Sequence, residues 1–187
     1  MSDLKYDYQE GSKFPAAALT TRVITLVTLA VSMGLLRSNS VTYKIGPSPV
    51  PFAYKDVATY EYVFFAMIAG FAYTLLQLPF AIFFFLIKKR LINNNAFIGF
   101  EFYGDKICLT ILATAVGSVF GATVETRKGA SLITHFDGGL YDANDYHSKV
   151  DDFCMISYIS AAFLLAGFLC SMTSSIMSSR ALARNYS

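Results

Sequence analysis

Residues 102–121, FYGDKICLTILATAVGSVFG, place an aspartate and a lysine at the start of a run that is otherwise apolar enough for the interior of a membrane. A transmembrane helix needs about 20 mostly apolar residues to cross the hydrocarbon core. The run has that length and predicts a membrane-spanning helix. Asp105 then needs an explanation, because a charged side chain alone in this zone costs about 3 kcal/mol.

The composition of the whole chain agrees with a membrane protein. Of its 187 residues 55% are hydrophobic and only 15% are charged, and the mean hydropathy is positive. Soluble domains rarely have this balance. The formal net charge of +2 is too small to indicate a nucleic-acid partner, and the basic residues gather near the ends of apolar runs, where they carry information on topology.

Four apolar runs are long enough to span a bilayer, and they predict an all-α membrane protein. The expected spans cover residues 16–36, 62–87, 102–124 and 153–177. They form one four-helix bundle domain over residues 1–187, with outer loops at 37–61 and 125–152. Prolines at positions 47, 49 and 51 exclude a helix in the first outer loop, so we expect an extended or polyproline-like chain there.

The orientation signal lies between the second and third expected spans. Lys88, Lys89 and Arg90 open this short connection, and short basic loops stay on the cytoplasmic side. With four spans, both termini then face the cytosol. The basic residues of the expected outer loops are scattered among acids, so they oppose this orientation only weakly.

Arg22 offers an explanation for Asp105. Excluding Arg22 from the first span would leave only residues 23–36, too short to cross, so Arg22 must lie inside the span near its cytosolic end. The third span starts at the same side, which places Asp105 at a similar depth. We therefore expect an intramembrane charge pair between Arg22 and Asp105. In the alternative, Arg22 snorkels to the interface and Asp105 faces cytosolic water separately.

Small residues recur every four positions in two of the spans, a pattern typical of close helix packing in membranes. The rows comprise Ala113, Gly117 and Gly121 in the third span, and Ala162, Ala166, Cys170 and Ser174 in the fourth. Packing within one bundle, packing between subunits and chance composition all stay open. In the second span, Pro79 removes a backbone donor and should bend the helix, with Gln77 near enough to satisfy a freed group.

No pattern in the chain indicates catalysis or a resident cofactor. There is no nucleophile elbow, phosphate-binding loop or HExxH motif, so we expect no catalytic residues and no enzyme activity. The second outer loop carries histidines and aspartates whose spacing matches no metal-binding loop: His135, Asp137, Asp142, Asp145 and His147. A solvated acidic loop without a metal site is the better interpretation.

Four segments together resemble the CASP-like family, four-span plant membrane proteins related to the Casparian strip membrane domain proteins and more distantly to the MARVEL group. They are TTRVITLVTLAV in the first span, YKDVATYEYVFFAMIAGFAYTLLQ entering the second, FYGDKICLTILATAVGS opening the third and DDFCMISYISAAFLLAGF entering the fourth. Their order and spacing cover all four spans.

The resemblance carries several implications. It implies that Arg22 and Asp105 are the family's characteristic intramembrane charges. It also implies plasma-membrane residence, assembly into homo- and hetero-oligomers with related four-span proteins, and platforms that recruit cell-wall-modifying enzymes. The first outer loop lacks the acidic-to-phenylalanine stretch of the family's namesakes, and the second lacks a tryptophan and an earlier cysteine to partner Cys154. We therefore do not expect a role in the Casparian strip itself.

These observations favour a non-enzymatic, oligomerising membrane scaffold whose surroundings are membrane lipid and related proteins. A small channel or transporter subunit, or an accessory subunit of a larger membrane complex, is the alternative. A conduction path needs polar residues along its length. The ionisable residues of the spans instead gather near one surface, and the mid-span positions are apolar, small or hydroxyl-bearing, which favours the scaffold.

Overall fold

Four long helices dominate the computed structural model, which describes residues 3–45, 48–87, 95–136 and 143–186. They are α1 (Asp3–Ser38), α2 (Ala58–Ile87), α3 (Asn95–Phe136) and α4 (Ala143–Tyr186). Each contains a segment long and apolar enough to cross a membrane: Ala16–Ser38, Ala58–Phe83, Phe102–Leu132 and Tyr146–Met177. The expected four-transmembrane-helix bundle is confirmed.

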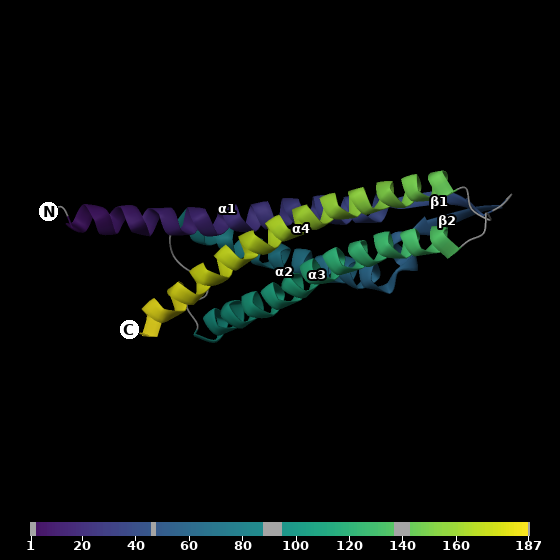
Figure 1. Ribbon diagram of the computed structural model, residues 1–187. Coiled ribbons are helices and arrows are strands. Elements are labelled where there is room, and N and C mark those ends of the chain that lie inside the picture. Colours follow the sequence, from purple (N-terminus) through teal and green to yellow (C-terminus); the bar gives the residue numbers. More distant parts are fainter. Residues whose placement is uncertain (1–2, 46–47, 88–94, 137–142, 187) are drawn as a thin grey trace.

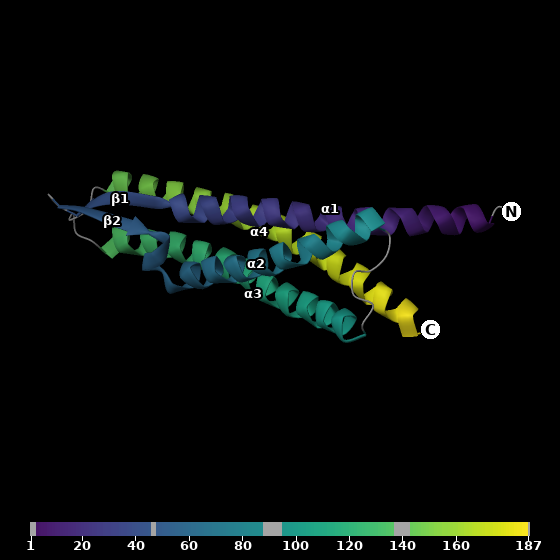
Figure 2. The same ribbon diagram turned by 180° about the vertical axis from the view of Figure 1, so that it is seen from behind.

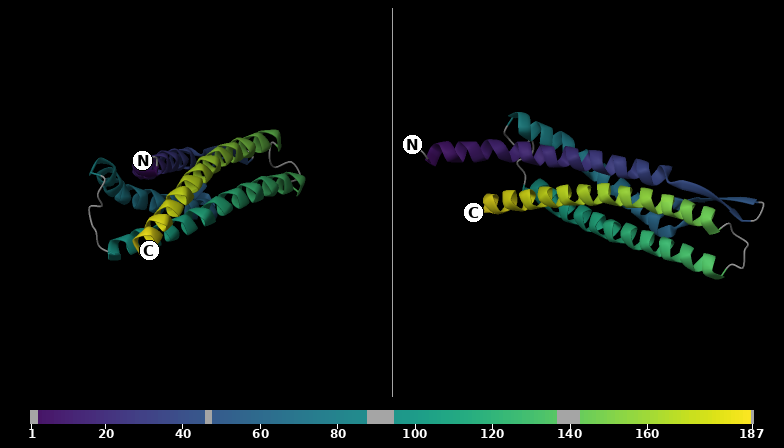
Figure 3. Two further views of the ribbon diagram at one scale, coloured as in Figure 1. Left: turned by 90° about the vertical axis from the view of Figure 1, so that its left-hand side faces the viewer. Right: turned by 45° about the horizontal axis from the view of Figure 1, so that its top comes forward.

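The helices form a closed ring in which α1 packs on α2, α2 on α3, α3 on α4, and α4 again on α1. Figure 1 and Figure 2 show both chain termini at one end of this elongated bundle and a two-stranded sheet at the other. Figure 3 shows the same arrangement from two further directions. This position of the termini is the one that an even number of antiparallel helices gives.

Apolar side chains occupy both the interior and the outer surface, as the bilayer requires. Leu29, Met67, Leu112 and Leu164 are buried at the centre of the ring, whereas many other large apolar side chains point outward. Leu76 is 71% exposed in the isolated chain, because it lies where lipid would surround the protein. With lipid as apolar as the core, contacts between helices must come from close packing and hydrogen bonds.

Hydroxyl groups supply such hydrogen bonds between α1 and α4. The Ser32 hydroxyl donates to the backbone oxygen of Ser160 (2.8 Å), and the Ser160 hydroxyl donates to that of Ser32 (2.9 Å). Just beyond α1, the fully buried Asn39 donates to the backbone oxygen of Phe153 (2.9 Å) and to the Ser157 hydroxyl (2.8 Å). Each bond of this kind contributes about 0.6 kcal/mol on average within a membrane.

The first outer loop folds into a hairpin of β1 (Ser40–Ile45) and β2 (Ser48–Ala53), followed by the short 3₁₀ helix η1 (Tyr54–Asp56). The strands are extended, as the prolines predict, but they are also paired in antiparallel register. Proline fits an edge strand where its nitrogen faces away from the partner. Alternate side chains turn toward the helices, where Tyr43 packs on Tyr146 and Phe52 on Phe153, each with ring centroids 5.1 Å apart.

Helical structure extends into the expected second outer loop, residues 125–152, from both of its ends. Helix α3 continues to Phe136 and α4 begins at Ala143, so most of that segment is helical. The charged residues there end the apolar run but do not end the helices. A helix can continue beyond the apolar region when its side chains pack against a neighbouring helix. Here a small core of Ala130, Tyr146, Val150 and Cys154 joins the two extensions.

Candidate functional site: a buried polar cluster and an outward row of small residues

Asp105 lies on α3 with only 4% of its surface exposed. Its Oδ1 atom accepts one hydrogen bond from the Tyr73 hydroxyl and one from the Gln77 side-chain amide, both at 2.8 Å. The Gln77 amide also donates to the Tyr73 hydroxyl. Tyr73 and Gln77 are four residues apart on α2, so both point toward α3 from one face of that helix.

Arg22 reaches the same cluster from α1. It is 6% exposed, and its Nη1 atom donates a long hydrogen bond (3.4 Å) to the backbone oxygen of Gln77. Gln77 therefore contacts Arg22 through its backbone and Asp105 through its side chain. The cluster joins three helices and holds both intramembrane charges in a polar environment. Direct coupling between Arg22 and Asp105 stays a prediction.

Gly104 makes room for this arrangement. A Cβ atom at position 104 would lie 2.5 Å from the Tyr73 hydroxyl oxygen, closer than real Cβ contacts allow. The absence of a side chain lets α2 approach α3 until Tyr73 reaches Asp105. Because the hydroxyl is fixed by Asp105 and Gln77, it has little freedom to move aside.

The side chains of this cluster are of types that connect helices through hydrogen bonds. A carboxylate, a guanidinium, an amide and a phenol can share hydrogen bonds and charge in a low-dielectric setting. Among the residues that the structure describes, no group of three His, Cys, Asp or Glu side chains is placed to hold a metal ion.

The row on α3 lies on the outside of the bundle. Ala113, Gly117 and Gly121 are all exposed in the single chain. A Cβ atom added at Gly117 or Gly121 would meet nothing within 4 Å. By contrast, an added Cβ at Gly167 would lie 2.9 Å from the Thr28 hydroxyl oxygen, so that glycine already serves contact between α1 and α4.

The row on α4 has a mixed position. Ala162 is exposed, Ala166 and Cys170 are half-buried, and Ser174 is buried. A period of four residues exceeds the 3.6 residues of a helical turn, so such a row winds slowly around the helix. The C-terminal end of this row, at Ser174, therefore contributes to the interior of the bundle, and its N-terminal end, at Ala162, faces outward.

Comparison with known proteins places this architecture in a family. The family model described as the Casparian strip membrane protein domain matches residues 11–170, which include the first three spans, most of the fourth, and both Arg22 and Asp105. The chain belongs to this Casparian strip membrane protein family. CASP-like protein 4D1 of Ricinus communis is 31% identical over 168 residues, covering 90% of this chain and 92% of the relative.

Two further relatives agree with the assignment. CASP-like protein 4D1 of Populus trichocarpa is 34% identical over 89% of this chain and 86% of its own length. CASP-like protein 4D2 of Arabidopsis thaliana is 32% identical over 89% of each chain. No solved structure matches. This Casparian strip family member is thus a multi-pass membrane protein with relatives in plants.

Two other predicted features of this family member stay predictions. Pro79 is exposed within α2, which continues as a helix to Ile87, and the expected bend stays a prediction. The topology residues Lys88, Lys89 and Arg90 lie outside the described residues. The cytosolic position of the termini therefore rests on the sequence alone.

Sequence reasoning missed the part that Tyr73 plays in this family member. It assigned Gln77 to backbone groups near Pro79, whereas the Gln77 side chain bonds to Asp105. A signal was present in the spacing: Tyr73 and Gln77 are the polar side chains four residues apart on a span that faces the aspartate-bearing helix. The glycine directly before Asp105 was a second signal, since it indicates a close approach.

Proposed function

We propose that this protein is a non-enzymatic, oligomerising scaffold of the plasma membrane. In this proposal its copies, and related four-span proteins, assemble side by side and organise a membrane subdomain. The observation that supports it most is the outward row of Ala113, Gly117 and Gly121, where the helix backbone is open over two turns. Rows of this kind let a second helix approach closely, which drives association in lipid.

The location and partners in this proposal rest on resemblance to the family. Both termini face the cytosol in this proposal, as the basic residues at 88–90 predict, and the hairpin end faces the cell wall. There the assembled platform recruits cell-wall-modifying enzymes, an expectation that rests on resemblance to the family's namesakes. Within the membrane, the outward-facing apolar side chains contact lipid.

The buried hydroxyls support a scaffold over a channel subunit. The Ser32 and Ser160 hydroxyls each donate to the other residue's backbone oxygen, and Asn39 donates to α4. Side chains engaged in this way join helices. A conduction path would instead need polar groups directed at a continuous aqueous space.

Replacing both Gly117 and Gly121 by leucine tests the assembly. The change fills the outward row without a clash inside the chain, and leucine favours a helix over glycine by roughly 0.8 kcal/mol. We expect the variant to fold and to shift from oligomer to monomer, as measured by native size in mild detergent and by crosslinking in the membrane.

Gly34→Leu is the matched control, because Gly34 is an exposed glycine on α1 with nothing within 4 Å of an added Cβ. It should leave the oligomer intact. If the double variant kept the size and crosslinking of the unaltered protein, the α3 row would not be an interface between subunits.

A further inference from the structure

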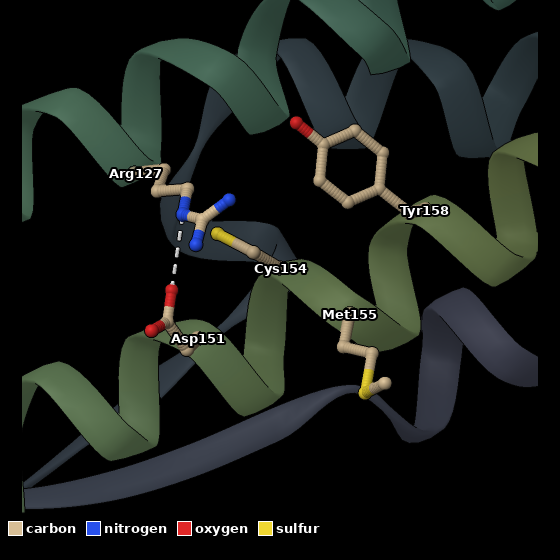
Figure 4. A pocket seen from close by; sticks show the side chains of 5 residues that line it. All are labelled: Arg127, Asp151, Cys154, Met155 and Tyr158. Carbon is tan, nitrogen blue, oxygen red and sulfur yellow. Dashed lines mark ion pairs between the residues drawn. The ribbon is translucent and has the colours of Figure 1, made fainter.

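A pocket of about 300 Å³ opens between α3 and α4 near the hairpin end of the bundle. It is lined by Arg127 from α3 and by Asp151, Cys154, Met155 and Tyr158 from α4 (Figure 4). The sulfur of Cys154 points toward Arg127, as does the carboxylate of Asp151. The lining therefore combines sulfur-containing and aromatic side chains, and the rim carries two opposite charges.

The two charges at the rim are accessible. Arg127 Nε lies 3.1 Å from Asp151 Oδ1, and the side chains are 64% and 56% exposed. An ion pair this exposed contributes little to stability. A ligand that bonds to both side chains can therefore separate them at little cost.

The pocket lies where the apolar part of the bundle ends. On α3, residues 107–124 contain no acidic or basic residue, and Glu125, Arg127 and Lys128 follow. On α4, residues 153–179 contain none, and Asp151 and Asp152 precede them. The charged rim is thus at headgroup level, and the apolar wall is at the level where acyl chains begin.

These features fit a zwitterionic lipid headgroup. A guanidinium binds phosphate oxygens through paired N–H groups, and a carboxylate attracts an ammonium group. A headgroup that carries phosphate and ammonium together matches both charges, whereas a purely anionic headgroup would meet the repulsion of Asp151. Below the rim, Met155 and Ile159 are 66% and 46% exposed and lie four residues apart, so they offer one apolar strip to an acyl chain.

We propose that this pocket binds one zwitterionic phospholipid from the leaflet at the hairpin end, with its phosphate on Arg127 and its ammonium group on Asp151. The site shares no residue with the outward row of α3. Its test and the assembly test therefore succeed or fail separately.

Native mass spectrometry of the purified protein in mild detergent tests the site. The protein is titrated with phosphatidylcholine, phosphatidylglycerol or diacylglycerol of matched acyl chains. We expect one tightly retained phosphatidylcholine and weaker retention of the other two lipids. Arg127→Gln should weaken phosphatidylcholine binding about tenfold, the size of one lost charge-assisted contact.

Asp151→Asn should act on selectivity, because it removes the repulsion of an anionic headgroup. We expect phosphatidylglycerol to bind this variant at least as well as phosphatidylcholine. Lys128→Gln and Asp152→Asn are the controls: each removes an equal charge from an exposed neighbouring position that does not line the pocket, and neither should alter retention. Far-UV circular dichroism and thermal unfolding check that every variant is folded.

Three results would overturn the proposal. Equal retention of diacylglycerol would show that the headgroup is not recognised. A preference of the unaltered protein for phosphatidylglycerol would indicate an anion site. Equal losses for Arg127→Gln and Lys128→Gln would show that the surface charge acts as a whole and that the pocket has no part in it.

Discussion

The buried polar cluster and the pocket of this protein each contain an arginine and an aspartate, in opposite surroundings. Arg22 and Asp105 are 6% and 4% exposed within the apolar spans, whereas Arg127 and Asp151 are 64% and 56% exposed at the hairpin end. The buried charges meet amide, phenol and backbone groups of α2, and the exposed charges meet each other directly. The same two residue types thus bond to a neighbouring helix in the buried cluster and form a solvent-accessible ion pair at the pocket.

Solvation explains the difference. A buried charge has lost its water, so each lost partner leaves an uncompensated group in a low dielectric. An exposed charge replaces a lost partner with water at little cost. We therefore expect substitutions at the buried cluster to affect stability far more than the same substitutions at the exposed pair.

Asp105→Leu should have the largest effect, because it removes the acceptor shared by Tyr73 and Gln77 and leaves Arg22 with less compensation. We expect a loss of about 3–5 kcal/mol in the free energy of unfolding, measured by denaturation in detergent micelles. Asp151→Leu is the control and should cost less than about 1 kcal/mol. Similar losses at both positions would contradict the contrast between the two regions.

Tyr73→Phe should have the next largest effect. The ring is kept, but the hydroxyl that donates to Asp105 at 2.8 Å is lost. A hydrogen bond to a charged group contributes about 1.5–3 kcal/mol, and we expect a loss of that size in the same unfolding measurement. Tyr62→Phe is the control, since the Tyr62 hydroxyl bonds to the Thr114 hydroxyl at an exposed site, and it should cost less. A Tyr73→Phe variant as stable as the control would remove Tyr73 from the cluster.

Gly104→Ala should have a smaller effect that is still destabilising. The added methyl group would lie 2.5 Å from the Tyr73 oxygen, and overpacking of this kind costs about 1–3 kcal/mol. Alanine also favours a helix over glycine by about 1 kcal/mol, so the net loss should be about 1 kcal/mol. Gly117→Ala, which meets nothing, should stabilise the protein. An equal gain in stability from both substitutions would show that α2 does not approach α3 so closely.

The main features of the fold could be predicted from the sequence because the bilayer imposes a length. Four apolar runs of sufficient length predict four helices. The apolar run after Arg22 is too short to cross the bilayer alone, so Arg22 is expected inside its span. The family could be identified from the order of short segments around Arg22 and Asp105. These inferences depend on local patterns, which a sequence shows directly.

The rest depends on contacts between distant residues, which a local pattern does not reveal. Asn39 was assigned to an outer loop, yet it is fully buried because its amide finds acceptors on α4, 114 and 118 positions away. The direction of the α3 row, outward, could not be read from its spacing, since the same spacing serves contacts inside the bundle at α4. The helical extensions beyond residue 124 depend on a small core that forms only when α3 and α4 lie side by side.

Paired double-mutant cycles test the contrast between the two regions most directly. One cycle combines Arg22→Leu with Asp105→Leu, and the other combines Arg127→Leu with Asp151→Leu, with the free energy of unfolding as the measured quantity. We expect a coupling of about 1–3 kcal/mol for the buried charges and about 0.2–1 kcal/mol for the exposed pair. The Arg22 and Asp105 double variant should then be more stable than the sum of the single losses implies. Additive losses at Arg22 and Asp105, with a coupling near zero, would contradict the contrast between the two regions.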